Sequence, residues 1–155
     1  MSAKAARKTK EFEDYLETIQ SYLYAIYKIE VYFDRSHDDA YYHEGYQIQE
    51  DDFITINKRR PKEWQVYALL HEAGHVLLRD ETDKYISRFP KINHPTLTIA
   101  KRIDTLREEV LAWERAKMLA EELSIEIDPV SFGRQRTNAL MKYSKWVVNP
   151  KDYTE

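Results

Sequence analysis

The sequence contains no cysteine, and this excludes disulfide bonds as well as metal sites built on thiolates. Any bound metal ion would have to be held by histidine, aspartate or glutamate. No apolar run approaches the ~20 residues of a membrane-spanning helix, and the first residues lack the apolar segment of a secretory signal. We therefore expect a soluble, cytoplasmic protein with no membrane partner.

Basic and acidic residues are also nearly balanced in number. The formal net charge of −3 gives no general argument for nucleic acid as a partner. Two segments are nevertheless basic and free of acidic residues: residues 1–10, with Lys4, Arg7, Lys8 and Lys10, and residues 134–145, with Arg134, Arg136, Lys142 and Lys145. A solvated tail and a solvated helix face are the simpler interpretations, and an anion-binding patch is the alternative for each.

The length of 155 residues fits one domain, large enough to bury roughly two thirds of the surface of the unfolded chain. No internal repeat and no low-complexity tract divides it. We predict a basic, flexible tail at residues 1–10 and a single domain at residues 11–155.

Hydrophobic periodicity predicts an N-terminal helix followed by a small sheet. Apolar residues recur at three- and four-residue steps across residues 11–28, the pattern of a helix with one buried stripe. Residues 29–33 and 53–57 are rich in β-branched and aromatic side chains, which favours strands, and a short strand is expected near residues 45–48. The sheet should therefore have about three strands.

The remainder of the chain is predicted to be helical. Pro61 suits the first turn of a helix, and apolar positions follow it at helical spacing. A polar connection is expected at residues 80–95, then a long helix at 96–123 without glycine or proline, and a last helix at 129–146. The predicted class is α+β, with an N-terminal helix, a small sheet, the helix after Pro61 and two further C-terminal helices.

The stretch His71-Glu72-Ala-Gly74-His75 carries the strongest chemical signal. On a helix, a four-residue spacing places His71 and His75 on one face, where both imidazoles can bind one zinc ion. Glu72 then lies beside the metal, where its carboxylate can take a proton from water. Gly74 costs a helix roughly 1 kcal/mol relative to alanine, so we expect a neighbouring element to pack closely against it.

A catalytic zinc site normally has three protein ligands, so a third must come from elsewhere. Glu109 falls within the apolar stripe of the long helix, where a carboxylate is costly unless it is paired or binds a metal ion. We therefore predict Glu109 as the third ligand, with an ion pair to an arginine as the alternative. Glu108 lies at the edge of the stripe and Glu114 opposite to it, so both are expected to be solvated.

Three other histidines are weaker candidates. His94 lies in the predicted connection, and a third histidine in a downstream loop is the arrangement of SprT-like proteases, so this alternative stays open. His37 and His43 lie in polar segments and are expected at the surface. The metzincin pattern is absent, because Leu78 and Glu81 stand where its glycine and third histidine would be.

These motifs resemble the ImmA/IrrE-type zinc metallopeptidases, a family found in phages, mobile elements and bacterial stress regulators. The resemblance covers residues 45–123, with a strand ending at Asn57, then the histidine motif, then Glu109 followed by Ala112. The chain departs from the usual family pattern at Trp113, where a Phe-Ala pair is absent.

The resemblance implies a zincin-like fold in which His71, His75 and Glu109 bind Zn²⁺ and Glu72 is the catalytic base. It implies an endopeptidase that hydrolyses a small set of intracellular protein targets, with a regulatory role. Two other hypotheses remain open. The protein could be a catalytically inactive member of this fold that binds a partner, or a helical interaction protein in which the motif is accidental. No helix-turn-helix segment is evident, so the resemblance adds no argument for a nucleic-acid partner.

Overall fold

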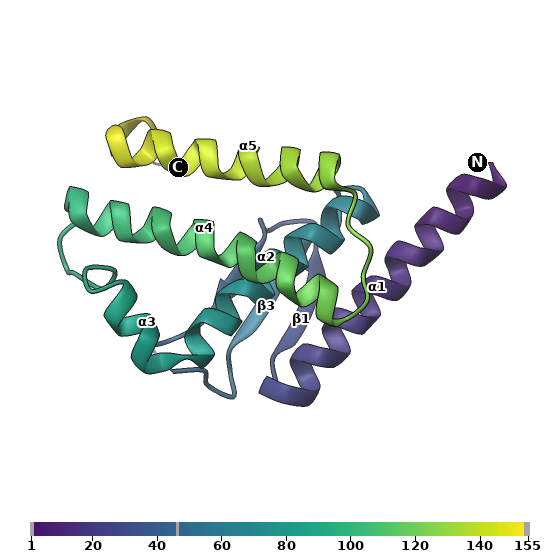
Figure 1. The fold of residues 1–155 in the computed structure, drawn as a ribbon, viewed down its shortest axis with the longest axis horizontal. Helices are drawn as coiled ribbons and strands as arrows, with labels where there is room; N and C mark the ends of the chain where they lie inside the picture. The colour runs from purple at the N-terminus through teal and green to yellow at the C-terminus, as the bar shows by residue number, and fades with distance from the viewer. Residues whose placement is uncertain (1, 46, 154–155) are drawn as a thin grey trace.

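The computed structural model describes residues 2–45 and 47–153 and has the predicted mixed α+β class (Figure 1). The helices in this part of the chain are α1 (Ala3–Tyr27), α2 (Lys62–Asp80), α3 (Thr82–Arg88), α4 (Ile99–Glu122) and α5 (Pro129–Val148), followed by a short 3-10 helix (Pro150–Tyr153). The strands are β1 (Glu30–Asp34), β2 (Ala40–Tyr42) and β3 (Phe53–Asn57). None of the helices within the described ranges is both long and apolar enough to cross a membrane.

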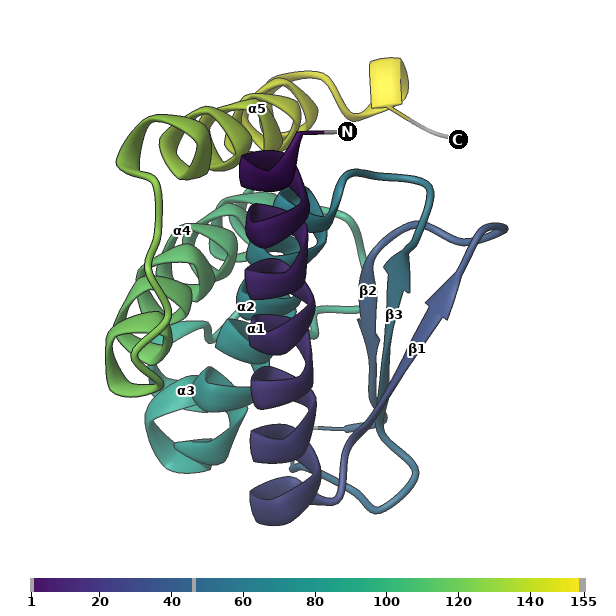
Figure 2. The same ribbon diagram turned by 90° about the vertical axis from the view of Figure 1, so that its right-hand side faces the viewer.

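The three strands form one sheet in the order β1-β3-β2. β1 is parallel to β3 and β2 is antiparallel to it. Because β3 lies between the other two strands, β2 occupies an edge of the sheet. One face of the sheet is covered by α1 and α2 (Figure 2). Ile54 and Ile56 of the central strand are fully buried, because alternate side chains of a strand point to the same face.

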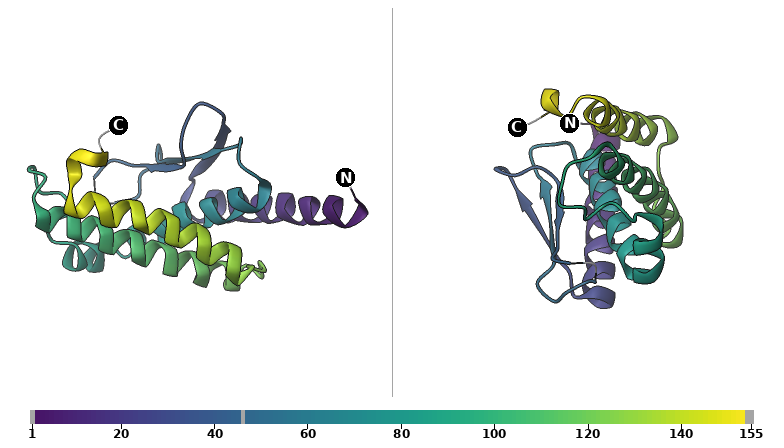
Figure 3. Two further views of the ribbon diagram at one scale, coloured as in Figure 1. Left: turned by 90° about the horizontal axis from the view of Figure 1, so that it is seen from above. Right: turned by 90° about the vertical axis from the view of Figure 1, so that its left-hand side faces the viewer.

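The remaining helices enclose α2. α4 packs on the side of α2 away from the sheet, and α5 runs antiparallel beside α4 (Figures 1 and 3). Most residues from 65 to 79 are consequently buried, whichever way their side chains point. A polar side chain on such a helix is shielded from water and needs a hydrogen-bond partner or an ion. The histidine motif lies in this segment.

Gly74 determines how closely α2 and α4 approach. A β-carbon at this position would overlap the carbonyl group of Ala112 on α4, so no larger residue fits unless one helix moves. This confirms the expectation that a neighbouring element packs closely against Gly74. The approach also places Glu108 and Glu109, one turn before Ala112, against the histidine motif.

α1 begins before the start of the helix that the periodicity predicts at residues 11–28. α1 begins at Ala3, where the side chain of Ser2 accepts a hydrogen bond from the backbone N–H of Ala5, so residues 3–10 are helical. These residues are almost all exposed, and without an apolar stripe no periodicity indicates a helix there. Their basic side chains are solvated, in agreement with the simpler interpretation of this segment.

Two further boundaries differ from the prediction. The short strand expected near residues 45–48 is β2 instead, at Ala40–Tyr42, and residue 46 lies outside the described residues. α3 lies within the connection that we expected to be only polar, because Tyr85 and Phe89, four residues apart, are buried against α2 and α4. The other predicted elements lie within a few residues of their observed bounds.

Candidate metal centre

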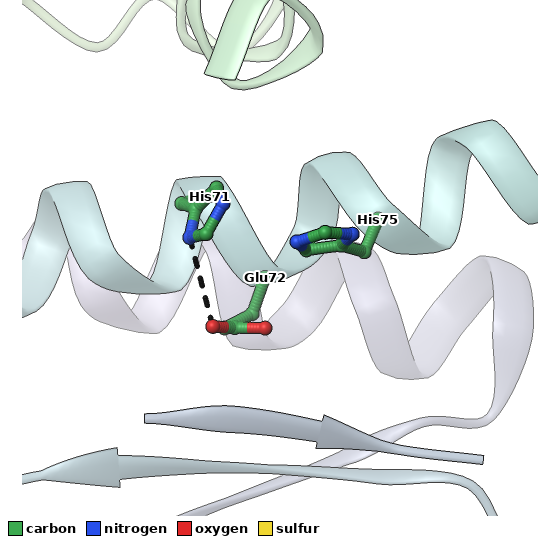
Figure 4. Close-up of side chains that lie close together, drawn as sticks. All are labelled: His71, Glu72 and His75. Carbon is green, nitrogen blue, oxygen red and sulfur yellow. Dashed lines mark ion pairs between the residues drawn. The ribbon is translucent and has the colours of Figure 1, made fainter. Parts of the chain in front are cut away.

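His71 and His75 lie on one face of α2, as their spacing predicts, with ring centroids 4.8 Å apart (Figure 4). Glu72 projects from the same helix toward the sheet, with a carboxylate oxygen 3.6 Å from Nδ1 of His71 (Figure 4). One possible ligand atom from each of these three residues lies within 4.8 Å of the others, so the group could hold a metal ion.

Glu109 of α4 meets the two histidines from the opposite side. Its two carboxylate oxygens lie 2.6 Å from Nε2 of His75 and 3.4 Å from Nε2 of His71. Ligands of a tetrahedral zinc ion with bonds near 2.0 Å are about 3.3 Å apart, so the 3.4 Å separation matches that of a ligand pair, while 2.6 Å is the length of a short hydrogen bond between His75 and Glu109. Glu72 instead approaches the other nitrogen of His71. Glu109 is therefore the carboxylate that faces both Nε2 atoms.

The buried Nε2 atom of His71 has no hydrogen-bond partner in the described part of the chain, although Glu109 is only 3.4 Å away. Leaving a buried ring nitrogen unpaired is costly. Two atoms that share one cation direct their lone pairs at the cation and not at each other, and this accounts for a short distance without a hydrogen bond. The donor set therefore fits a metal ion.

The charges at the site also favour a cation. Three carboxylates, those of Glu72, Glu108 and Glu109, surround two imidazoles in a region shielded from water. Burial alone would lower the pKa of His75. The attraction of Glu109 and the hydrogen bonds to Glu108 and Glu109 outweigh burial and raise this pKa well above its ordinary value. Burial opposes ionisation of Glu109, yet His75 and His71 hold its pKa below the usual range. A divalent cation would neutralise the surplus negative charge.

The expectation that Glu108 is solvated is wrong. Glu108 is 8% exposed, and one of its oxygens lies 3.1 Å from Nδ1 of His75. The other oxygen accepts a hydrogen bond from the hydroxyl of Tyr85 on α3, and Arg79 donates to that hydroxyl. A carboxylate at Nδ1 favours the tautomer whose Nε2 lone pair is free for a metal. Glu114 is exposed, as expected.

Trp113 orients the other imidazole. Its ring stacks on His71 with the centroids 4.3 Å apart and the planes 10° apart. The tryptophan follows Glu109 by one turn of α4 and is 2% exposed, so it restricts the rotation of the His71 ring. The position at which this chain departs from the ImmA/IrrE pattern therefore has a local structural role.

Glu72 is placed to transfer protons. Burial raises its pKa above the ordinary glutamate value, while His71 and His75 act in the opposite direction. A carboxylate with a raised pKa is a better proton acceptor near neutral pH than an ordinary one.

Two cavities meet at the site. The larger, about 750 Å³, is walled by α2, α4 and α5, and the smaller, about 240 Å³, lies beside β2. The residues that line both are Asp39, Glu72, Glu109 and Tyr143. A ligand can therefore reach the site from two directions.

Two residues near the site were not identified from the sequence. Burial raises the pKa of Tyr143 on α5, and Glu109 and Glu72 raise it further, so the phenol stays protonated at neutral pH. Burial also raises the pKa of Asp39, in the loop before β2, to about 7. Asp39 accepts a hydrogen bond of 2.8 Å from the backbone N–H of Asn57. No local pattern marks either residue, because both reach the site only through the fold.

The remaining histidines are not members of the group that could hold a metal ion. Nδ1 of His94 lies 3.1 Å from both the backbone oxygen and the backbone nitrogen of Thr96, in the connection before α4. His37 is exposed, as expected. His43 is also exposed, but it lines the smaller cavity beside His75.

No protein-family model, curated protein or solved structure matches this chain. The resemblance to the ImmA/IrrE peptidases therefore rests on the motif residues and the order of the elements, and a function has to be argued from the site.

Proposed function

We propose that this protein is a zinc-dependent endopeptidase with a zincin-like fold, related to the ImmA/IrrE peptidases. One observation carries the proposal: Glu109 comes from a separate helix to the Nε2 atoms of His71 and His75, while Glu72 lies beside them at the other nitrogen of His71. A structural zinc site is usually closed by four protein ligands and needs no free carboxylate. Three ligands with an adjacent general base are the arrangement of a hydrolytic site.

His71, His75 and Glu109 would hold the zinc ion, which when bound supplies a Lewis acid that polarises a peptide carbonyl and lowers the pKa of water. Trp113 and Glu108 keep the two imidazole rings in the orientation that this requires. The ligands are thus preorganised by contacts from α4.

Glu72 carries the proton through the proposed reaction. It accepts a proton from the attacking water and delivers it to the leaving amine, acting first as base and then as acid. Tyr143, which lines both cavities beside Glu72, is the candidate donor to the oxygen of the peptide carbonyl as negative charge develops on it.

The edge of the sheet offers a place for the substrate backbone. β2 has an unpaired edge, and its residues Ala40 and Tyr41 line the smaller cavity next to the metal centre. An extended peptide can add to such an edge through main-chain hydrogen bonds. We expect the substrates to be a few regulatory proteins of the cytoplasm.

The proposal is tested by metal analysis and by two substitutions. Purified protein should contain about one equivalent of zinc, and His71→Ala should contain none. Glu72→Gln should retain zinc and lose cleavage of a partner captured on the inactive variant by roughly 10²–10⁴-fold. If Glu72→Gln supports the same biological effect as the parent, the protein acts by binding, and the peptidase proposal is wrong.

A further inference from the structure

Four basic side chains line the larger cavity: Arg60 before α2, and Arg134, Lys142 and Lys145 on α5. All four are exposed, and none forms an ion pair with another residue within the described ranges. Arg60 packs over the ring of Trp64 at 5.1 Å, which leaves its guanidinium edge available. No ion pair within the described ranges therefore neutralises these four cations.

The acidic residues of the same cavity do have partners. Glu63 accepts hydrogen bonds from the hydroxyls of Tyr67 and Ser131. Asp39 accepts one from a backbone N–H, and Glu72 and Glu109 belong to the metal centre. Apart from the residues at the metal centre, the cavity is therefore lined by four cations and one carboxylate, that of Glu63, and the net charge of this lining is positive.

The α5 cations follow one face of the helix. Arg134, Asn138, Met141, Lys142 and Lys145 all line the cavity, at helical spacing. The eleven-residue step from Arg134 to Lys145 corresponds to roughly 16 Å along the helix axis. An extended peptide covers that distance with about five residues.

We propose that the larger cavity selects substrates with a run of aspartate or glutamate residues on one side of the cleaved bond. This inference rests on the proposed function, because the metal centre at the end of the cavity is what makes its occupant a substrate. Unpaired cations around a concave site concentrate acidic ligands, and arginine can hold a carboxylate through two hydrogen bonds.

A continuous polyphosphate chain fits this cavity less well than a peptide does. It would pass Asp39 and Glu72, two carboxyl groups of the cavity that the zinc ion is not proposed to bind, and their negative charge would repel it. A peptide with acidic residues at one end places its neutral backbone there. The observations therefore favour an acidic peptide over nucleic acid.

The experiment measures binding to the zinc-loaded Glu72→Gln protein by fluorescence anisotropy. The probes are labelled peptides of equal length with about five consecutive glutamates, serines or lysines, and a single-stranded oligothymidylate. The glutamate peptide should bind at least about tenfold more tightly than the serine peptide at low salt, and high salt should reduce this advantage.

Two double substitutions with equal change in charge test whether the preference for the glutamate peptide depends on the cavity cations. Arg134→Glu combined with Lys145→Glu should abolish the preference for the glutamate peptide. Lys4→Glu combined with Lys117→Glu changes the net charge equally at exposed positions outside the cavity, and should preserve it. Circular dichroism checks that both variants are folded.

Several results would overturn the inference: equal binding of the serine and glutamate peptides, a preference that survives the cavity reversal, or tighter binding of the oligothymidylate. If zinc- and Glu72-dependent cleavage is found without a preference for acidic peptides, only the inference fails. If the acidic preference depends on the cavity cations but no zinc is bound, the proposed function fails instead.

Discussion

Gly74 of α2 lies directly against the carbonyl group of Ala112 of α4, and this contact sets the spacing of the two helices that carry the candidate metal centre. The imidazoles project from one helix and Glu109 from the other, so their separation depends on the backbone approach. A residue without a side chain therefore controls the geometry of the site.

Gly74→Ala is expected to force the two helices apart. We expect a loss of about 1–3 kcal/mol in the free energy of unfolding, because the new methyl group meets backbone that cannot rotate away. Zinc affinity should fall as well. Denaturant unfolding and zinc titration measure the two effects.

Gly133→Ala is the matched control for this substitution. Gly133 lies inside α5, and a β-carbon there would have no neighbour within 4 Å. This variant should be more stable than the parent by about 0.5–1 kcal/mol, since alanine favours the helix. Unchanged stability and zinc affinity in Gly74→Ala would show that the close approach does not matter.

Glu108, Glu109 and Glu114 of α4 should differ in their effect on zinc. Glu109→Ala should abolish binding, because Glu109 faces both imidazoles. Glu108→Gln should weaken it by about 10–100-fold, since the carboxylate orients His75 without facing its Nε2. The exposed Glu114→Gln should match the parent. Competition with a chromogenic chelator gives the zinc affinities. If only Glu108→Gln lost zinc, Glu108 would replace Glu109 as the proposed third ligand.

Tyr143→Phe should separate chemistry from binding. If its phenol donates to the developing oxyanion, removal of the hydroxyl should lower kcat by about 10²–10³-fold and leave KM and zinc content nearly unchanged. Tyr24→Phe, at a tyrosine that is 53% exposed on α1, is the control. A rise in KM at constant kcat would assign Tyr143 to substrate binding instead.

Asp39 should make the stability of the metal-free protein depend on pH. Burial raises its pKa from 3.8 to about 7, so the folded state binds this proton more tightly than the unfolded state. The contribution to stability is present below about pH 4 and is lost as the pH rises toward 7.

Asp39→Asn should remove this contribution while keeping an acceptor for the backbone N–H of Asn57. Between pH 4 and 7 the variant should lose less stability than the parent. We expect a difference of roughly 1 kcal/mol, because Asp39 is partly exposed and solvent screens it. Urea unfolding at several pH values measures the difference, and the exposed Asp38→Asn is the control. Parallel pH profiles for parent and Asp39→Asn would contradict the assignment.

Helical periodicity in the sequence was enough to predict that His71 and His75 share a helix face and that Glu109 is buried. A spacing of four residues places His71 and His75 on one face of any helix, and the phase of the apolar stripe on α4 places Glu109 on its buried side. Both arguments use local geometry, which does not depend on how the helices pack. The class of the fold and most element bounds follow from the same periodicities.

The tertiary structure alone decided which other residues reach the candidate metal centre. Glu108 meets His75 because α2 and α4 pack closely at Gly74, and Tyr85 of α3 donates a hydrogen bond to its other oxygen. Tyr143 and Asp39 arrive from α5 and from the loop before β2, and the basic face of α5 turns toward the larger cavity. Such contacts join segments far apart in the chain, and long-range packing, which no local pattern records, determines them.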